Sequence, residues 1–396
     1  MTKYQKTIIH AVGAISYAVS QWLVLTFAAR FISLEAAGLY SYYLAILTPA
    51  SILFSLGLRN SISSDLNSTT KYSSYLSAQL IGITGFTAFF ITIAIIENSI
   101  NNILIAVFLI KAIELSSELT YGDWVRRGIA QKYGVSKILR FILFIPIFIV
   151  SLQLFKEKEE CLYSYPIAMA IVYLLYDMRY SNTTKEKPCK DLAKILSIIK
   201  IALPLAFGSL IVSLGSSAPR LLIKFLINTE SVALYTILAY FTSIAAIPLT
   251  SLTQVLIPKL SQENNSSPEK AKTITKKLTC ATVIYGVTFT IFTCLFAGWA
   301  IQTIYKVTYN YHFMDYLAVG IGGAFQFLTV LGNAILFSKR EFKSFLTTSC
   351  FSMLLVILIT PISIYSLGLN GAFLGQMISS IATTALTWKY IMIQRR

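Results

Sequence analysis

Long apolar runs recur along the whole chain and are separated by short polar segments. Runs of about 20 residues are long enough to cross the hydrocarbon core of a bilayer as α-helices. No small-residue cleavage site ends the first apolar run, so we interpret that run as a retained span. The longest connection is expected at 258–277, which leaves no room for an inserted soluble domain. The pattern predicts twelve spans, near 8–30, 39–58, 75–96, 102–121, 137–155, 162–178, 201–227, 232–256, 278–299, 313–337, 343–365 and 369–392.

Composition supports this interpretation. Of the 396 residues, 56% are apolar and 13% are charged, whereas about a quarter are charged in soluble domains. The mean hydropathy is +0.68. Five cysteines without a CxxC pair and two histidines offer neither a disulfide framework nor a metal site, so no metal is expected. The predicted fold class is an all-α polytopic membrane protein.

The net charge is +16, and its distribution along the chain predicts the orientation in the membrane. Lys and Arg concentrate in alternate connections, such as the one that we expect to hold Arg126, Arg127, Lys132, Lys137 and Arg140. Short loops rich in Lys and Arg remain on the cytoplasmic side of a membrane. We therefore expect both termini in the cytoplasm and no nucleic acid as partner.

A faint internal repeat divides the chain. The sequence EAAGLYS at 35–41 opens the second span, and ESVALYT at 230–236 opens the eighth, about half the chain further on. Two six-helix bundles are predicted, 1–192 and 193–396, related by a pseudo-two-fold axis along the membrane normal. The alternative is that both segments are ordinary helix starts, where an acidic residue suits the helix dipole.

Three segments carry a resemblance to a known family. The stretch AARFISLEAAGLY at 28–40 resembles the first hairpin of the O-antigen repeat-unit flippases (Wzx type). These flippases form part of the polysaccharide-exporter branch of the multidrug/oligosaccharidyl-lipid/polysaccharide (MOP) superfamily. The stretch from PRLL at 219–222 to Leu234 and Tyr235 resembles that family's seventh and eighth helices, and GLNGAFLG at 368–375 resembles the start of its last helix.

The resemblance implies a MATE-like fold in which a V-shaped pair of six-helix bundles encloses a cavity. It implies a flippase of the bacterial inner membrane that moves undecaprenyl-diphosphate-linked oligosaccharide from the cytoplasmic to the periplasmic leaflet by ion-coupled alternating access. Its expected partners are that lipid-linked oligosaccharide, membrane lipid, an O-antigen polymerase and a chain-length regulator. No cofactor and no catalytic residue are expected.

Ionisable groups inside spans are the first candidates for a site, because burying them in a membrane is costly. Lys111, Glu114 and Glu118 fall on one face of the fourth span. They predict a polar stripe along the cavity, with Lys111 toward the diphosphate and Glu114 or Glu118 available for ion coupling. The alternative is a Lys–Glu salt bridge that only lets the helix pack.

A second candidate set lies near the outer ends of the first and seventh spans. Arg30, Arg220 and Lys224 are basic, and an arginine fork matches phosphate oxygens. We expect them to bind the diphosphate. The alternative is that they extend to the headgroup region, as basic residues at span ends commonly do. Gly371 and Gly375 are expected to mark a close helix contact.

Two other functions remain open. A drug/cation antiporter of the same superfamily would be expected to carry a carboxylate in its first helix, yet residues 8–29 contain no Asp or Glu. An integral-membrane O-antigen polymerase would be expected to have a long outer loop, and none is predicted. The sequence therefore favours a transporter over an enzyme.

Overall fold

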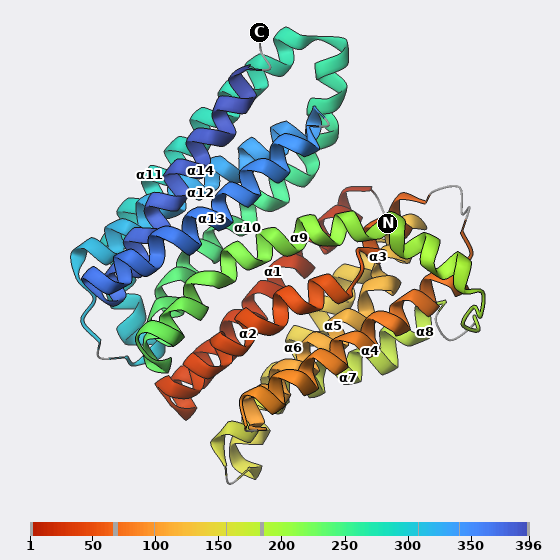
Figure 1. The fold of residues 1–396 in the computed structure, drawn as a ribbon, viewed down its shortest axis with the longest axis horizontal. Coiled ribbons are helices and arrows are strands. Elements are labelled where there is room, and N and C mark those ends of the chain that lie inside the picture. Colours follow the sequence, from red (N-terminus) through yellow and green to blue (C-terminus); the bar gives the residue numbers. More distant parts are fainter. Residues whose placement is uncertain are drawn as a thin grey trace. The chain divides into compact units, whose positions relative to one another are not determined.

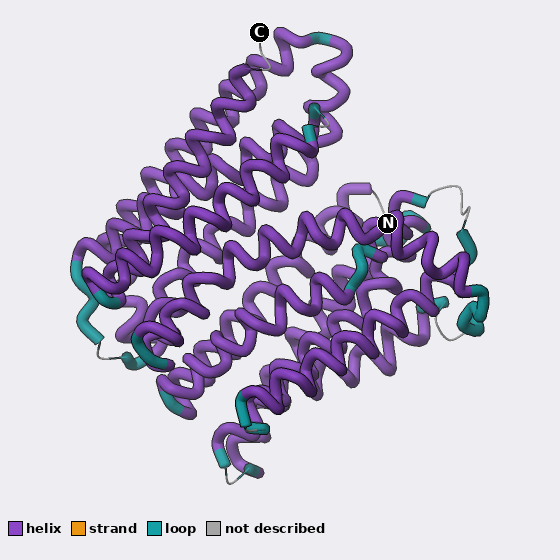
Figure 2. The backbone as a smooth tube through the Cα atoms, viewed as in Figure 1, coloured by secondary structure: helices purple, strands orange, loops and turns teal. Residues whose placement is uncertain are grey.

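The computed structural model describes residues 3–65, 70–98, 100–155, 157–182, 186–307, 309–339 and 341–393, and within these ranges it contains helices and no strand (Figures 1 and 2). The first half holds α1 (Lys3–Phe27), the π-helix η1 (Ala28–Ile32), α2 (Leu34–Phe54), α3 (Leu58–Ser64), α4 (Tyr72–Ile96), α5 (Asn102–Arg126), α6 (Gln131–Leu154), the 3-10 helix η2 (Lys158–Tyr163), α7 (Ser164–Val172), the π-helix η3 (Tyr173–Asp177) and α8 (Met178–Tyr180). The second half holds α9 (Leu192–Leu226), α10 (Thr229–Ser266), α11 (Pro268–Tyr305), α12 (Phe313–Ser338), α13 (Phe342–Leu367) and α14 (Leu369–Ile393).

Each of the twelve predicted spans falls on a helix or on a run of consecutive helices in the described residues. Ten of these segments are long and apolar enough to cross a membrane, including the segment Lys158–Tyr180 that η2, α7, η3 and α8 form together. The other two, α5 and α14, are 25 residues long but more polar. The all-α polytopic membrane fold is confirmed.

One predicted connection is wrong. The segment 258–277 was expected to be a loop, but α10 continues to Ser266 and α11 begins at Pro268. The segment contains five Lys, two Glu and one Gln, which are good helix formers in water, so the helices extend beyond their apolar parts. Proline is favourable at the first position of a helix, which suits the start of α11.

Contacts divide the chain into two compact units, residues 1–213 and 214–396. This boundary lies inside α9, whereas the predicted repeats meet at 192 and 193. The difference arises because the first turns of α9 pack in unit 1: Ile198 and Ala202 share a buried cluster with Leu58 and Leu119. Whether the two halves are true repeats stays a prediction.

In unit 1, local sequence features position the helices that carry the site. Ser33 accepts a hydrogen bond from the Ala36 backbone N–H and caps α2, and Asn101 caps α5 in the same way through Leu104. Gly57 adopts a left-handed conformation with φ of 66° between α2 and α3. Only glycine adopts this conformation without strain, so Gly57 permits the sharp turn that leads into α3.

In unit 2, small residues bring helices close together. A β-carbon at Gly371 would overlap the Ser363 carbonyl of α13, and one at Gly375 would lie 3.0 Å from the Thr360 Cα. The close helix contact predicted for Gly371 and Gly375 is therefore confirmed as a contact between α13 and α14.

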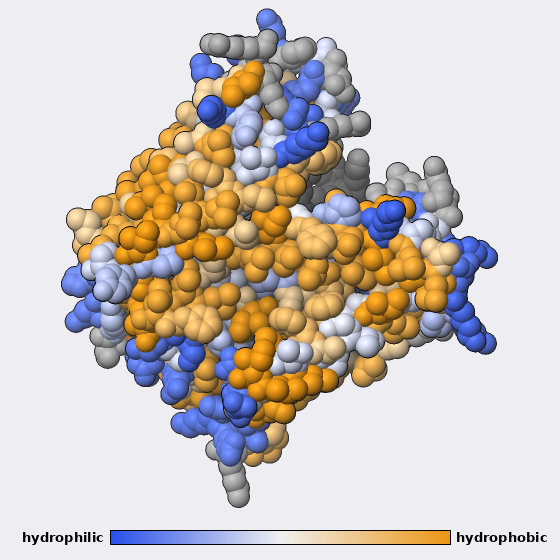
Figure 3. Space-filling model, in the orientation of Figure 1, coloured by the Kyte–Doolittle hydropathy of each residue, from blue (hydrophilic) through white to orange (hydrophobic). Residues whose placement is uncertain are grey.

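Large apolar side chains on the outside are typical of a lipid-facing surface. Ile95, Phe225 and Trp299 are each at least two-thirds exposed. On the face drawn in Figure 3, apolar residues cover the middle parts of the helices and hydrophilic residues gather at helix ends. Such broad apolar surfaces are rare on soluble monomers and are stable in contact with lipid.

Candidate functional site

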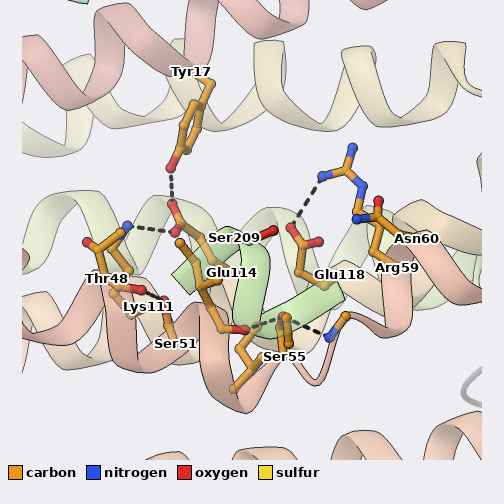
Figure 4. Close-up of a pocket in the computed structure, with 14 residues that line it drawn as sticks. Tyr17, Thr48, Ser51, Ser55, Arg59, Asn60, Lys111, Glu114, Glu118 and Ser209 are labelled. Atoms are coloured by element: carbon orange, nitrogen blue, oxygen red, sulfur yellow. Dashed lines mark hydrogen bonds and ion pairs between the residues drawn. The ribbon is translucent and has the colours of Figure 1, made fainter. Parts of the chain in front are cut away.

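The polar stripe of α5 lines a cavity in unit 1. Lys111, Glu114 and Glu118 all contribute to its wall, and its volume is about 460 Å³. Leu115 of α5 also lines the cavity. The remaining wall comes from α1, α2, the turn into α3, α3 and α9 (Figure 4): Tyr17, Thr48, Ser51, Ile52, Ser55, Gly57, Arg59, Asn60, Ala206 and Ser209. The structure thus brings together the three residues that the sequence singled out on this helix.

Glu114 is firmly held. Its Oε2 lies 2.9 Å from the Lys111 Nζ, and its Oε1 accepts a hydrogen bond of 2.7 Å from the Tyr17 hydroxyl (Figure 4). The Gln21 amide donates a longer bond of 3.4 Å to the same Oε1. The Lys111 and Glu114 side chains are 6% and 19% exposed. The salt bridge kept as an alternative therefore exists, and it lies in the cavity wall.

Glu118 is held less firmly. Its Oε1 lies 3.4 Å from the Arg59 Nη1, and the two side chains are 32% and 31% exposed. Arg59 also stacks its guanidinium on the Tyr133 ring, 4.7 Å from the ring centroid. Arg59 was not predicted as a site residue, because it follows the second predicted span and its carboxylate partner lies 59 residues further on.

A further cation lies close to the same aromatic side chains. The Lys137 Nζ is 3.8 Å from the Tyr17 ring centroid and 4.6 Å from that of Tyr133. Such cation–π contacts hold a charge without neutralising it. Lys137 was expected in a loop, but it lies inside α6. Tyr133 lies one turn before Lys137 in α6, so this contact is local in sequence. Tyr17 lies in α1, and its contact with Lys137 could not be predicted from nearby sequence.

A third ion pair is buried deeper in unit 1. The Arg140 Nη2 lies 2.7 Å from the Asp177 Oδ2, and the side chains are 3% and 0% exposed. Arg140 also donates to the Ser117 hydroxyl at 2.7 Å, and the Tyr121 hydroxyl donates to Asp177 at 3.2 Å. Arg140 was counted with the basic residues of the connection before the fifth predicted span, although that span, 137–155, includes it. In the structure α6 begins at Gln131, so Arg140 lies within the helix and bonds to Asp177 inside unit 1.

Arg30 is not among the residues that line this cavity, and Arg220 and Lys224 belong to unit 2. Arg30 is exposed in η1, with its guanidinium 5.8 Å from the Phe31 ring centroid. In unit 2, Arg220 donates to the Ser216 carbonyl at 3.4 Å, and Lys224 donates to the Thr229 hydroxyl at the start of α10. The Arg220 side chain thus points toward the start of α9, and the Lys224 side chain points toward its end. Their joint role with Arg30 remains a prediction.

In the part of the chain that the structure describes, His, Cys, Asp and Glu side chains form no group of three or more that could hold a metal ion. The cavity instead combines cations, carboxylates and hydroxyl groups. Arginine and lysine side chains bind phosphate and carboxylate oxygens, and the hydroxyl groups can donate or accept further hydrogen bonds. The wall therefore offers hydrogen bonds to a polar group, and it holds two cations, Lys111 and Arg59, each paired with a carboxylate.

Solved structures with similar folds are membrane transporters. An inward-facing multidrug-resistance MATE transporter of the MOP superfamily matches with a TM-score of 0.73 at 14% identity, over 97% of this chain and 94% of that one. The MATE multidrug transporter DinF-BH matches with a TM-score of 0.73 at 15% identity, over 99% and 95%. The Vibrio cholerae MATE transporter VcmN in its bent form matches with a TM-score of 0.63 at 12% identity, over 98% and 94%.

The fold defines the class: a multi-pass membrane protein with the architecture of the MOP-superfamily transporters. The chain belongs to the family described as polysaccharide biosynthesis protein, whose model matches residues 4–263. It is also 28% identical to the capsular polysaccharide biosynthesis protein CapF of Staphylococcus aureus, over 300 residues that make up 74% of each chain. The prediction of a MATE-like fold is confirmed by these structures, and the family match agrees with the predicted link to polysaccharide biosynthesis.

Proposed function

We propose that this protein is a flippase for a lipid-linked oligosaccharide, the repeat unit of a surface polysaccharide. The observation that carries the proposal is the charged cavity of unit 1 in a chain of the polysaccharide biosynthesis family. Undecaprenyl diphosphate is the proposed lipid carrier. Cargo moves from the cytoplasmic to the periplasmic leaflet of the inner membrane by alternating access, and both termini lie in the cytoplasm.

The cavity wall suits two parts of this cargo. Lys111 and Arg59 are the cations that line it, and the diphosphate is the anion that they attract. The hydroxyl groups of Thr48, Ser51 and Ser55 can bond to sugars. Glu114 and Glu118 are the proposed groups for ion coupling. O-antigen is the glycan that the sequence resemblance implied, and similarity to CapF adds a capsular repeat unit as the second possibility.

Complementation tests the function. The gene is expressed in two bacterial hosts that lack their own repeat-unit flippase, one making O-antigen and one making a capsule, and surface polysaccharide is measured. We expect restoration in one host, and that host identifies the glycan. Raised resistance to cationic drugs without surface polysaccharide in either host would favour the drug/cation antiporter instead.

Charge-removing variants then test each of the two candidate anion sites. A lost phosphate contact costs about 1.5–3 kcal/mol, roughly ten- to a hundredfold in affinity. Lys111→Met and the triple variant Arg30→Ala, Arg220→Ala, Lys224→Ala are each expected to reduce surface polysaccharide at normal protein levels, and Arg→Lys changes are expected to retain more. Lys194→Met, at a side chain that is 70% exposed, is the control. Full polysaccharide in both Lys111→Met and the triple variant would contradict binding of a diphosphate by these residues.

A further inference from the structure

The two ion pairs in the cavity differ in how they are built. Glu114 uses both carboxylate oxygens, one for Lys111 at 2.9 Å and one for Tyr17 at 2.7 Å. Charge-assisted hydrogen bonds of about 2.7–2.9 Å are the strong ones. The Glu118 carboxylate lies 3.4 Å from Arg59, and about a third of each side chain is exposed. Exposed pairs of this kind contribute little because water screens them. Glu118 is therefore the more easily displaced carboxylate.

Arg59 does not depend on Glu118 for its position. Its guanidinium stacks on Tyr133, and its backbone lies against α5, where a β-carbon at Gly122 would be 2.8 Å from the Arg59 carbonyl oxygen. In Figure 4 the Arg59 side chain lies on the Glu118 side of the cavity, away from Lys111. Its fork therefore stays in place when its carboxylate partner leaves, and a fixed fork binds two phosphate oxygens with little loss of conformational freedom.

We propose that Glu118 is an internal counter-ion that occupies Arg59 in the empty cavity, and that the anionic headgroup displaces it to bind Arg59. The Lys111–Glu114–Tyr17 cluster stays intact as the fixed wall. The identity of the anion as a diphosphate rests on the proposed function. Exchange keeps Arg59 paired with an anionic group before and after binding, so neither state leaves its charge without a counter-charge. Glu118, which is partly exposed, stays hydrated after it is displaced.

The exchange also explains how a tightly bound anion leaves again. Glu118 remains on the neighbouring turn of α5, one turn beyond Glu114, and competes for Arg59 at all times. A carboxylate tethered in the cavity has a high effective concentration. Removing its charge is therefore expected to strengthen anion binding and to slow release.

A double-mutant cycle with inorganic pyrophosphate tests the proposal on the full-length protein in lipid nanodiscs. Calorimetric titration is expected to show that Glu118→Gln tightens pyrophosphate binding about two- to fivefold, the worth of an exposed ion pair. Arg59→Gln is expected to weaken binding about tenfold or more. In the Arg59→Gln background, adding Glu118→Gln is expected to leave the pyrophosphate affinity unchanged, because the arginine for which Glu118 competes is absent.

Other outcomes overturn the exchange. Unchanged affinity in Glu118→Gln would mean that Glu118 does not compete, and tightening that persists without Arg59 would mean a general effect of negative charge. Arg59→Lys keeps the charge without the fork, so an intermediate affinity is expected even if Arg59→Gln fails to fold. Pyrophosphate binding as expected without restored surface polysaccharide would refute the proposed function and leave the exchange standing. Restored polysaccharide with unchanged affinity in Glu118→Gln would refute the exchange alone.

Discussion

Arg140 and Asp177 form a more deeply buried ion pair than any other in the described residues. The pair joins α6 to the π-helix η3, and Ser117 and Tyr121 of α5 bond to it. Within the described ranges, Arg140 Nε and Asp177 Oδ1 are buried and have no hydrogen-bond partner. The pair is thus only partly satisfied, and each member depends on the other to remain inside.

Removing one member is therefore expected to be costly. Asp177→Asn keeps the size of the side chain but leaves the Arg140 charge buried without a counter-charge. We expect a loss of about 3–5 kcal/mol in stability, seen as a lower thermal unfolding temperature of the detergent-solubilised protein. Replacing both members, Arg140→Met with Asp177→Leu, is expected to regain most of that loss, since apolar groups of similar size need no partner.

The control is the exposed pair of Lys194 and Asp191, whose charged atoms lie 3.0 Å apart. Asp191→Asn is expected to leave the unfolding temperature unchanged, because water already solvates both groups. An Asp177→Asn protein as stable as the native one would show that the buried pair is not what holds α6 and η3 together.

The sequence predicted single residues well where the signal was local. Lys111, Glu114 and Glu118 repeat at helical spacing inside one span, so their common face followed from helix geometry alone. The ion pairs of Arg59 and Arg140 were not predicted, because their partners, Glu118 and Asp177, are 59 and 37 residues away. Tertiary contacts of this kind leave no periodic pattern in one sequence.

At the scale of elements, glycine sets the distance between α1 and α6. A β-carbon at Gly134 would overlap the Ile9 carbonyl, and one at Gly13 would overlap the Gly134 backbone. Tyr17, which bonds to Glu114, lies one turn further along α1. The close contact between α1 and α6 therefore also positions Tyr17 in the cavity wall.

Gly134→Ala is expected to force these helices apart and to cost about 1–3 kcal/mol, the usual effect of overpacking. Thermal unfolding in detergent measures the loss. Gly208→Ala is the matched control within a helix, because a β-carbon there meets nothing within 4 Å. It is expected to be neutral or to stabilise by up to about 1 kcal/mol, the difference in helix propensity. Equal unfolding temperatures for both variants would contradict the claim that Gly134 sets the distance between α1 and α6.

Helix positions followed from the apolar pattern, because a span must satisfy its own backbone hydrogen bonds and bury about 20 residues in lipid. The ends of helices that extend into polar segments could not be predicted from the apolar pattern. The segment 258–277 carries helix formers, but its polarity made it look like a loop, and α10 and α11 continue through it. The π-helix η3 and the turn at Gly57 depend on tertiary packing and were not predicted.

At the scale of the whole molecule, the family and the MATE-like architecture were predictable because apolar runs and family-like segments occur along the whole chain. The boundary between compact units was not, since α9 begins in one unit and ends in the other. The glycan was not predictable either. Hydroxyl-rich cavity walls accept many sugars, and discrimination depends on where individual donors and acceptors lie.

The topology of the chain depends on α5, the helix that carries the site. It is too polar to count among the ten apolar spans, yet Lys111 and Glu114 face a cavity lined by protein. Ionisable groups inside a membrane are tolerated where they face a protein interior or water and pair with one another. We therefore expect α5 to cross the membrane, which puts three spans, α4, α5 and α6, between Lys71 and Lys158.

Single cysteines placed at the exposed positions Lys71, Lys158, Lys187 and Lys270, in a background without the five native cysteines, test this count. An impermeant maleimide is expected to label position 158 on intact spheroplasts, and positions 71, 187 and 270 only after permeabilisation. An odd number of spans separates 71 from 158, and an even number separates 187 from 270. If α5 stayed on one side, 71 and 158 would label together, and the charged cavity would lie outside the membrane, where it could not carry a lipid-linked headgroup across.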